Sequence, residues 1–217
     1  MTRKAFPTFL SAVLIGCLII GILGNLTDYT GIAVLIVAVL ICISTQLLAN
    51  RINTLKFTHF RLAIGIGLLA MLAGQIFVLG TMPVTVYHDP YRVLSQADQM
   101  AAGHMTWNIT YFWRYANNVP LAYLMSLWLR VTQLFGLKTN LSVHLLSILT
   151  LDSFIVLLLS TIWKMSHRKS LVAGVLAFLA LTPFAYTYYL QVFYSDLTTM
   201  LVLLIVMRVV IDWPQGS

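Results

Sequence analysis

The chain has 217 residues, of which 60% are hydrophobic and only 9% are charged, and its formal net charge is +7. Because about a quarter of the residues in a soluble domain are charged, this composition excludes an ordinary soluble protein and indicates a multispanning membrane protein. All six acidic residues are aspartates, which excludes sites that require glutamate, such as the HExxH helix of metalloproteases. The basic residues lie in short loops between apolar runs, so the positive charge is typical of a cytoplasmic membrane face and predicts no nucleic-acid partner.

Apolar runs long enough to cross a bilayer recur along the chain. About 20 residues are needed to cross a hydrocarbon layer of ~30 Å. The sequence predicts an all-α, polytopic membrane helix bundle of about six spanning helices, at 7–25, 30–49, 62–82, 140–163, 170–190 and 196–211. The first run follows Arg3 and Lys4 and lacks a small-residue cleavage site, which predicts a retained span rather than a cleaved signal. Residues 1–217 carry no internal repeat or linker, so one membrane domain is expected.

The long stretch that a bilayer could not hold is the loop 83–139. Asp89-Pro90 predicts the start of a helix, because Asp is favoured at the N-cap and Pro at the first helical position. Gly103 is placed to end this helix. Its apolar side is formed by Val93, Leu94, Ala97, Met100 and Ala101. On this pattern alone, Asp89 is either a simple helix cap or a functional carboxylate.

The run 119–135 is short for a span and carries Ser126, Arg130 and Gln133 as one polar stripe, which favours a helix lying flat at the membrane surface. Charge counting supports this position, because it leaves nine basic residues on the cytoplasmic side and four outside, as the positive-inside rule requires. The chain is then expected in the cell membrane with a cytoplasmic N-terminus, and the loop 83–139 and the turn before Asp196 share the outer face. The four outer basic residues are Arg92, Arg114, Arg130 and Lys138.

Several short motifs follow one another in and after this loop. In chain order they are Asp89-Pro90-Tyr91-Arg92, Gln96-Ala97, Met100 to Trp107, Tyr111 to Arg114, Asn117 to Tyr123, Leu134-Phe135-Gly136 and Ser142 to Leu145. The series resembles the first outer loop of GT-C glycosyltransferases, in the branch that contains protein O-mannosyltransferases and bacterial lipid A aminoarabinose transferases. The resemblance covers residues 62–205. Pro90, His104 and His144 depart from it, since they stand where that branch often has a second acid, an aspartate and an arginine.

The resemblance implies an inverting glycosyltransferase that transfers a sugar from a polyprenyl-phosphate carrier to an unidentified glycan, lipid or protein acceptor on the outer face. Asp89 is the implied base, because the attacking hydroxyl must lose its proton, and Asp196 matches the second acidic position of this fold. The implied donor-phosphate ligands are Arg92 and Arg114, whose guanidinium groups suit phosphate. The implied sugar or lipid groove is lined by Tyr91, Trp107, Tyr111, Trp113 and Tyr115.

Each implied role has a structural alternative. Asp196 is equally well placed to cap the last helix, and the aromatic residues fit an ordinary interfacial belt. Carboxylates suit Mg or Mn, but spacing alone does not place Asp89 and Asp196 together, so the sequence assigns no metal site.

Two other functions stay open at this point. Asp152 in mid-span and the glycines Gly65, Gly67 and Gly74 would suit a transport or assembly protein, although Asp152 is expected to make a structural contact with His144 or another helix. Transferases of this class are usually longer, so an N-terminal fragment or an inactive truncated copy is the other alternative.

Overall fold

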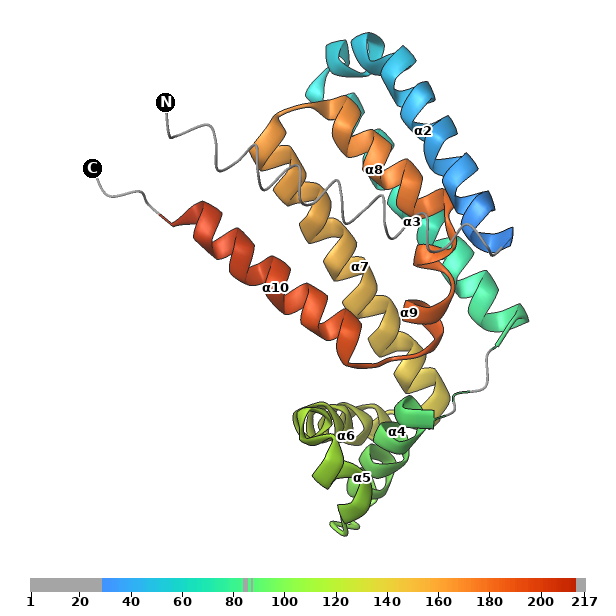
Figure 1. Ribbon diagram of the computed structural model, residues 1–217, viewed down its shortest axis with the longest axis vertical. Coiled ribbons are helices and arrows are strands. Elements are labelled where there is room, and N and C mark those ends of the chain that lie inside the picture. The colour runs from blue at the N-terminus through green and yellow to red at the C-terminus, as the bar shows by residue number, and fades with distance from the viewer. Residues whose placement is uncertain (1–28, 84–85, 87, 214–217) are drawn as a thin grey trace.

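The described chain is helical throughout. The computed structural model describes residues 29–83, 86 and 88–213, and within these ranges it contains helices and connecting turns but no strand. The all-α prediction is confirmed. Figure 1 shows long helices side by side and a compact group of shorter helices beyond one of their ends.

Three helices are long and apolar enough to cross a membrane, which indicates a membrane protein. They are α2 (Tyr29–Thr54), α3 (Phe57–Thr81) and α7 (Thr139–Ser166), with 26, 25 and 28 residues. At about 1.5 Å per residue, each is longer than the ~30 Å hydrocarbon layer. These helices match the predicted spans 30–49, 62–82 and 140–163, whereas the predicted span 7–25 lies outside the described residues.

The predicted span 170–190 is broken rather than straight. α8 (Lys169–Leu181) is followed by the 3-10 turn η2 (Pro183–Ala185) and by α9 (Tyr188–Gln191), with a bend of 67° at the break. Thr182 is extended, with φ −109° and ψ 162°, because the proline that follows it disfavours the helical conformation. The sequence-based prediction of one continuous helix is therefore wrong at Pro183.

The predicted span 196–211 forms α10 (Ser195–Asp212), which has 18 residues. Asp196, Arg208 and Asp212 make this helix more polar than the three long ones. If α8 and α9 count as one broken span, the described chain has up to four candidate spans. The predicted number of six is not confirmed.

Basic residues that were predicted to share the cytoplasmic side tie helices together at one end of the bundle. Lys169 Nζ donates to two carbonyl oxygens around the C-terminus of α2, where a cation also interacts favourably with the helix dipole. Asp212 of α10 pairs with Lys164 of α7 and, at 2.9 Å, with Arg208. This ion pair gives the Arg208 charge a partner one helical turn further along α10.

A polar pair and two glycines fix the packing inside the bundle. Gln75 of α3 is fully buried and donates from Nε2 to Asp152 Oδ1 of α7 at 2.9 Å, so the predicted structural contact of Asp152 is with another helix. A Cβ at Gly67 or Gly74 would lie 2.9 Å from a side chain of α8 or of the segment after it. These two glycines therefore form a packing seam rather than a pathway.

The group of shorter helices comprises α4 (His88–Ala101), α5 (Ile109–Arg114), η1 (Ala116–Asn118) and α6 (Val119–Leu134). Gly103 ends α4 as predicted, with φ +91°: its N–H donates to the Met100 carbonyl, and the His104 N–H donates to that of Gln99. This arrangement satisfies carbonyls that the last helical turn leaves free. Gly136, with φ +71°, ends α6 in the same way.

The shorter helices are attached to the N-terminal end of α7. Thr139 Oγ1 donates to Asp98 Oδ1 of α4, and Trp128 Nε1 of α6 donates to the Ser142 carbonyl, both at 2.8 Å. In Figure 1, α6 lies across the end of α7 rather than alongside it. The residues buried between α4, α5 and α6 are Val93, Ala97, Tyr111, Phe112, Leu121, Ala122, Met125 and Leu129.

One part of the predicted polar stripe on α6 is wrong. Arg130 and Gln133 are exposed, but Ser126 is only 1% exposed and donates to the Tyr123 carbonyl. The polar stripe is therefore narrower than predicted. Arg130, which remains part of it, donates from Nη2 to the Met100 carbonyl at the end of α4.

The two ends of the bundle should lie on opposite sides of the membrane. In a chain whose native cysteines are replaced, Lys138→Cys beside α6 should react with an impermeant thiol reagent on intact cells. Arg168→Cys lies at the opposite end of the bundle, which carries the basic residues and is called the basic end. It should react only after the cells are permeabilised. Labelling of position 138 solely from the cytoplasmic side would contradict the surface position of α6.

Candidate functional site

The first turn of α4 carries two of the predicted site residues on one face. α4 begins at His88, so Asp89 lies in the first turn, where the helix dipole favours a carboxylate. Arg92 follows three positions later and therefore shares its face. Both side chains are near α5: Arg92 Cζ lies 5.4 Å from the centroid of the Tyr111 ring, and the charge of Asp89 acts on the same phenol.

A buried glutamine holds α5 in this position. Gln96 of α4 is 3% exposed, its Nε2 donates to the Thr106 carbonyl at 2.9 Å, and its Oε1 accepts from the Asn108 N–H at 3.0 Å. Asn108 in turn caps α5, because its Oδ1 accepts from the Tyr111 N–H at 3.2 Å. The turn that leads into α5 is thus fixed to α4 through both ends of one side-chain amide.

The two predicted phosphate-binding arginines rest against one pair of aromatic rings. The ring centroids of Tyr111 and Tyr115 are 5.0 Å apart, and Arg114 Cζ lies 5.6 Å from the centroid of Tyr115. Cation–π contacts at exposed sites contribute only ~0.5–1 kcal/mol and leave the positive charge unneutralised. Within the described ranges, neither Arg92 nor Arg114 has an ion pair or a hydrogen bond, so both guanidinium groups are available to an anion.

A single asparagine joins this site to the segment that precedes α10. Asn118 is fully buried, and its Nδ2 donates to the hydroxyl oxygens of Tyr111 at 2.9 Å and of Tyr194 at 2.8 Å. Phe193, next to Tyr194, is buried in the same apolar cluster as α4, α5 and α6. The two segments that were predicted to share the outer face therefore meet in space.

The phenol of Tyr111 is strongly held in its protonated form. Burial raises the pKa of Tyr111 well above its usual value of 10.0, and a hydrogen bond with Tyr194 and the charge of Asp89 act in the same direction. The hydrogen bond from Asn118 opposes this change without overcoming it. Tyr111 is therefore neutral at pH 7 and positions its neighbours as an uncharged group.

The predicted groove residues do not share one environment. Tyr91 and Trp113 are 56% and 87% exposed, whereas Tyr111 is 2% exposed. Trp107 is half-buried and packs edge to face on Phe112, with ring centroids 4.9 Å apart. Trp113 has the exposure expected of an interfacial aromatic side chain. Tyr111 is buried beneath the Arg92 guanidinium group and does not face a groove.

Asp196 lies two residues after Tyr194 in the chain, but it does not occupy the N-cap position of α10. It is exposed in the first turn of α10, which begins one residue earlier, at Ser195. The alternative role as N-cap residue is therefore not what the structure shows. Within the described ranges, no group of three or more His, Cys, Asp or Glu side chains is arranged to hold a metal ion.

Asn118 and Tyr194 are the site residues that sequence reasoning missed. Asn118 stands directly before Val119-Pro120, where an asparagine suggests an ordinary helix cap. It does occupy the N-cap position of α6, but its side chain makes no capping hydrogen bond. The only available signal was its place in the motif series, which carries no information about a partner 76 positions away.

A groove with a volume of about 490 Å³ lies elsewhere, between α3, α7 and α8 at the basic end of the bundle. It contains none of the predicted site residues.

No known protein family, curated protein or solved structure matches the chain. The glycosyltransferase resemblance therefore stays a prediction.

Replacing Tyr111 with Phe should lower the free energy of unfolding by about 1–2 kcal/mol at neutral pH, because Asn118 loses a buried acceptor. Above the ordinary pKa of 10.0 the unfolded chain releases the Tyr111 proton while the folded chain keeps it, so rising pH destabilises the wild type through a group that the Phe variant lacks. The difference between the two proteins should shrink as the pH increases. Denaturant-induced unfolding of both proteins in detergent measures this difference in the free energy of unfolding.

The exposed Tyr91 offers a matched control, and Tyr91→Phe should change stability little at any pH. A Tyr111→Phe effect that stays constant from neutral to strongly alkaline pH would contradict the burial of a protonated Tyr111 phenol.

Proposed function

We propose that the chain is a membrane glycosyltransferase that transfers a sugar from a polyprenyl-phosphate donor to an acceptor hydroxyl at the α4–α6 end of the bundle. The observation that carries the proposal is that the short helices hold one aspartate together with two arginines. Neither arginine has an acidic partner within the described ranges. Asp89 and Arg92 share one helical face, and Arg114 reaches the same aromatic pair.

Arg92 and Arg114 bind the phosphate of the donor. A guanidinium group can donate two parallel hydrogen bonds to phosphate oxygens, and such charge-assisted bonds are stronger than neutral ones. The Tyr111 and Tyr115 rings hold both groups in place beforehand, which lowers the entropy cost of ordering them on binding. As the bond between the sugar and the phosphate breaks, the arginines stabilise the negative charge that develops on the leaving phosphate.

Asp89 accepts the proton of the attacking hydroxyl. The hydroxyl oxygen forms a bond to the anomeric carbon on the side opposite the phosphate, the bond to the phosphate oxygen breaks, and the configuration inverts. The carboxylate is half-buried and has no ion pair within the described residues, which leaves it free to act as the base. Asp196 is the candidate for contacts to the acceptor or the donor from the α10 side.

A non-catalytic transport or assembly role is the second candidate. One observation favours it: the break at Pro183, since interrupted helices are common at transport sites. Asp152, the acidic residue inside the bundle, already accepts a hydrogen bond from Gln75, which favours a structural role for that carboxylate. An inactive copy of a transferase would keep the α4–α6 geometry without turnover.

Transfer from a radiolabelled polyprenyl-phosphate sugar by the purified chain separates these functions. Asp89→Asn should lower the rate by about a hundredfold or more, the usual range for loss of a general base. Asp98→Asn, on the same helix, should retain activity because an amide oxygen can still accept from Thr139. Asp152→Asn should retain activity for the same reason toward Gln75.

Equal loss of transfer in the Asp89 and Asp98 variants would contradict a catalytic role for Asp89. Absence of transfer by the wild type, together with a transport activity that Asp152→Asn abolishes, would replace the transferase by the transport candidate.

A further inference from the structure

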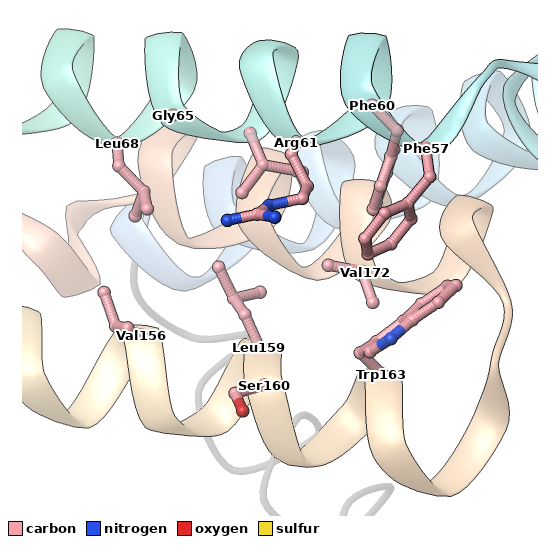
Figure 2. Close-up of a pocket in the computed structure, with 11 residues that line it drawn as sticks. Phe57, Phe60, Arg61, Gly65, Leu68, Val156, Leu159, Ser160, Trp163 and Val172 are labelled. Atoms are coloured by element: carbon pink, nitrogen blue, oxygen red, sulfur yellow. The ribbon is translucent and has the colours of Figure 1, made fainter.

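The groove of about 490 Å³ at the basic end has the size of a small-ligand site, for which ~300–1,000 Å³ is usual. Its walls come from α3, α7 and α8 and are apolar apart from Arg61 and Ser160. Figure 2 shows Arg61 extending from α3 into the space between α3 and α7, above Leu159. The apolar lining residues include Phe57, Phe60, Gly65, Leu68, Leu159 and Trp163.

Among the described residues that line the groove, Arg61 is positively charged and none is acidic. Within the described part of the chain, the only partner of the Arg61 guanidinium is the Phe57 ring, whose centroid lies 5.8 Å from Arg61 Cζ. Ser160, in the opposite wall, accepts a hydrogen bond from Arg208. Arg61 is exposed and has no acidic partner within the described residues, so its guanidinium group is available to an anion at the mouth of the groove.

Aromatic side chains place one end of the groove at a membrane interface. The Trp163 ring contacts Phe57 and Phe60, with centroid distances of 5.4 and 6.0 Å. Trp side chains with basic neighbours are typical of the lipid headgroup level. The groove then runs from the headgroup level along α3 as far as Leu68, about 16 Å at 1.5 Å per residue.

We propose that this groove binds an anionic phospholipid, with one acyl chain along the apolar walls and the phosphate on the Arg61 guanidinium. A lipid matches both the apolar walls of the groove and its positive charge. In contrast, the uncharged predicted span 7–25 would cover the walls but leave Arg61 without a counter-ion. Basic pockets between membrane helices on the cytoplasmic side are known to take anionic headgroups. The site is separate from the proposed donor site at the opposite end of the bundle.

Photocrosslinking of the full chain in phosphatidylcholine nanodiscs tests the site. Phosphatidylglycerol with a photoactivatable acyl chain, added as a minor component, should label peptides from 57–68 and 156–172. It should do so about fivefold more than the matching phosphatidylcholine probe, the factor for one basic side chain near an anionic lipid. Arg61→Gln should remove this preference, whereas Arg51→Gln, a basic residue at the same end, should keep it.

Glycine substitutions test the acyl-chain position. A Cβ at Gly65 would meet nothing within 4 Å, and the same is true of Gly80 on the same helix. Gly65→Leu should therefore extend a side chain into the groove and reduce labelling by both probes, while Gly80→Leu should leave labelling unchanged. Excess inorganic phosphate should not compete, because the acyl chain contributes to binding.

The proposal would be overturned by equal labelling by the two lipid probes, by unchanged labelling in Gly65→Leu, or by full competition by inorganic phosphate. Absence of any labelling in the groove would also overturn it and would indicate that protein, such as residues 7–25, covers the groove.

Discussion

One buried amide, that of Asn118, connects the two parts of the candidate site. Its nitrogen donates to the Tyr111 and Tyr194 hydroxyl groups, and those tyrosines are separated in sequence by the helices α6, α7, α8 and α9. A buried polar group without a partner costs ~1–3 kcal/mol, so the fully buried Asn118 favours the arrangement in which both phenols are present. The position of α10 relative to α4, α5 and α6 depends on this contact and on Phe193 in the shared apolar cluster.

The candidate chemistry depends on a second set of contacts around the same tyrosine. Gln96 fixes the turn before α5 through two backbone groups, and this places the Tyr111 ring against Arg92. Because Tyr111 stays neutral, it supports the arginine without neutralising it. Asp89 then lies on the same face of α4 as a basic group and within electrostatic range of Tyr111. Arg92 is thus supported by a ring that is itself buried and hydrogen-bonded.

The sequence predicts the local features of this structure well. Long apolar runs identify α2, α3 and α7, and Gly103 ends α4 because only a left-handed residue closes its last turn in this way. Hydropathy does not detect the break at Pro183, since the residues on both sides of it are apolar. Nor can it identify Asn118 as a bridge, because that role depends on a partner brought near only by folding. Asp89 and Arg92 were named through the order of the motifs and their resemblance to a family, whereas the bridging role of Tyr194 required the structure.

The most direct test of the candidate site is equilibrium binding of a polyprenyl phosphate without a sugar, which removes catalysis from the measurement. Arg92→Gln should weaken binding by about tenfold, the equivalent of one charged hydrogen bond of ~1.4 kcal/mol. Asp89→Asn should not weaken it, because that carboxylate acts on the acceptor. Arg130→Gln provides the control, since this arginine lies at the same end but already donates to Met100. Wild-type affinity in Arg92→Gln, or an equal loss in Arg130→Gln, would contradict a phosphate site on the Tyr111–Tyr115 pair.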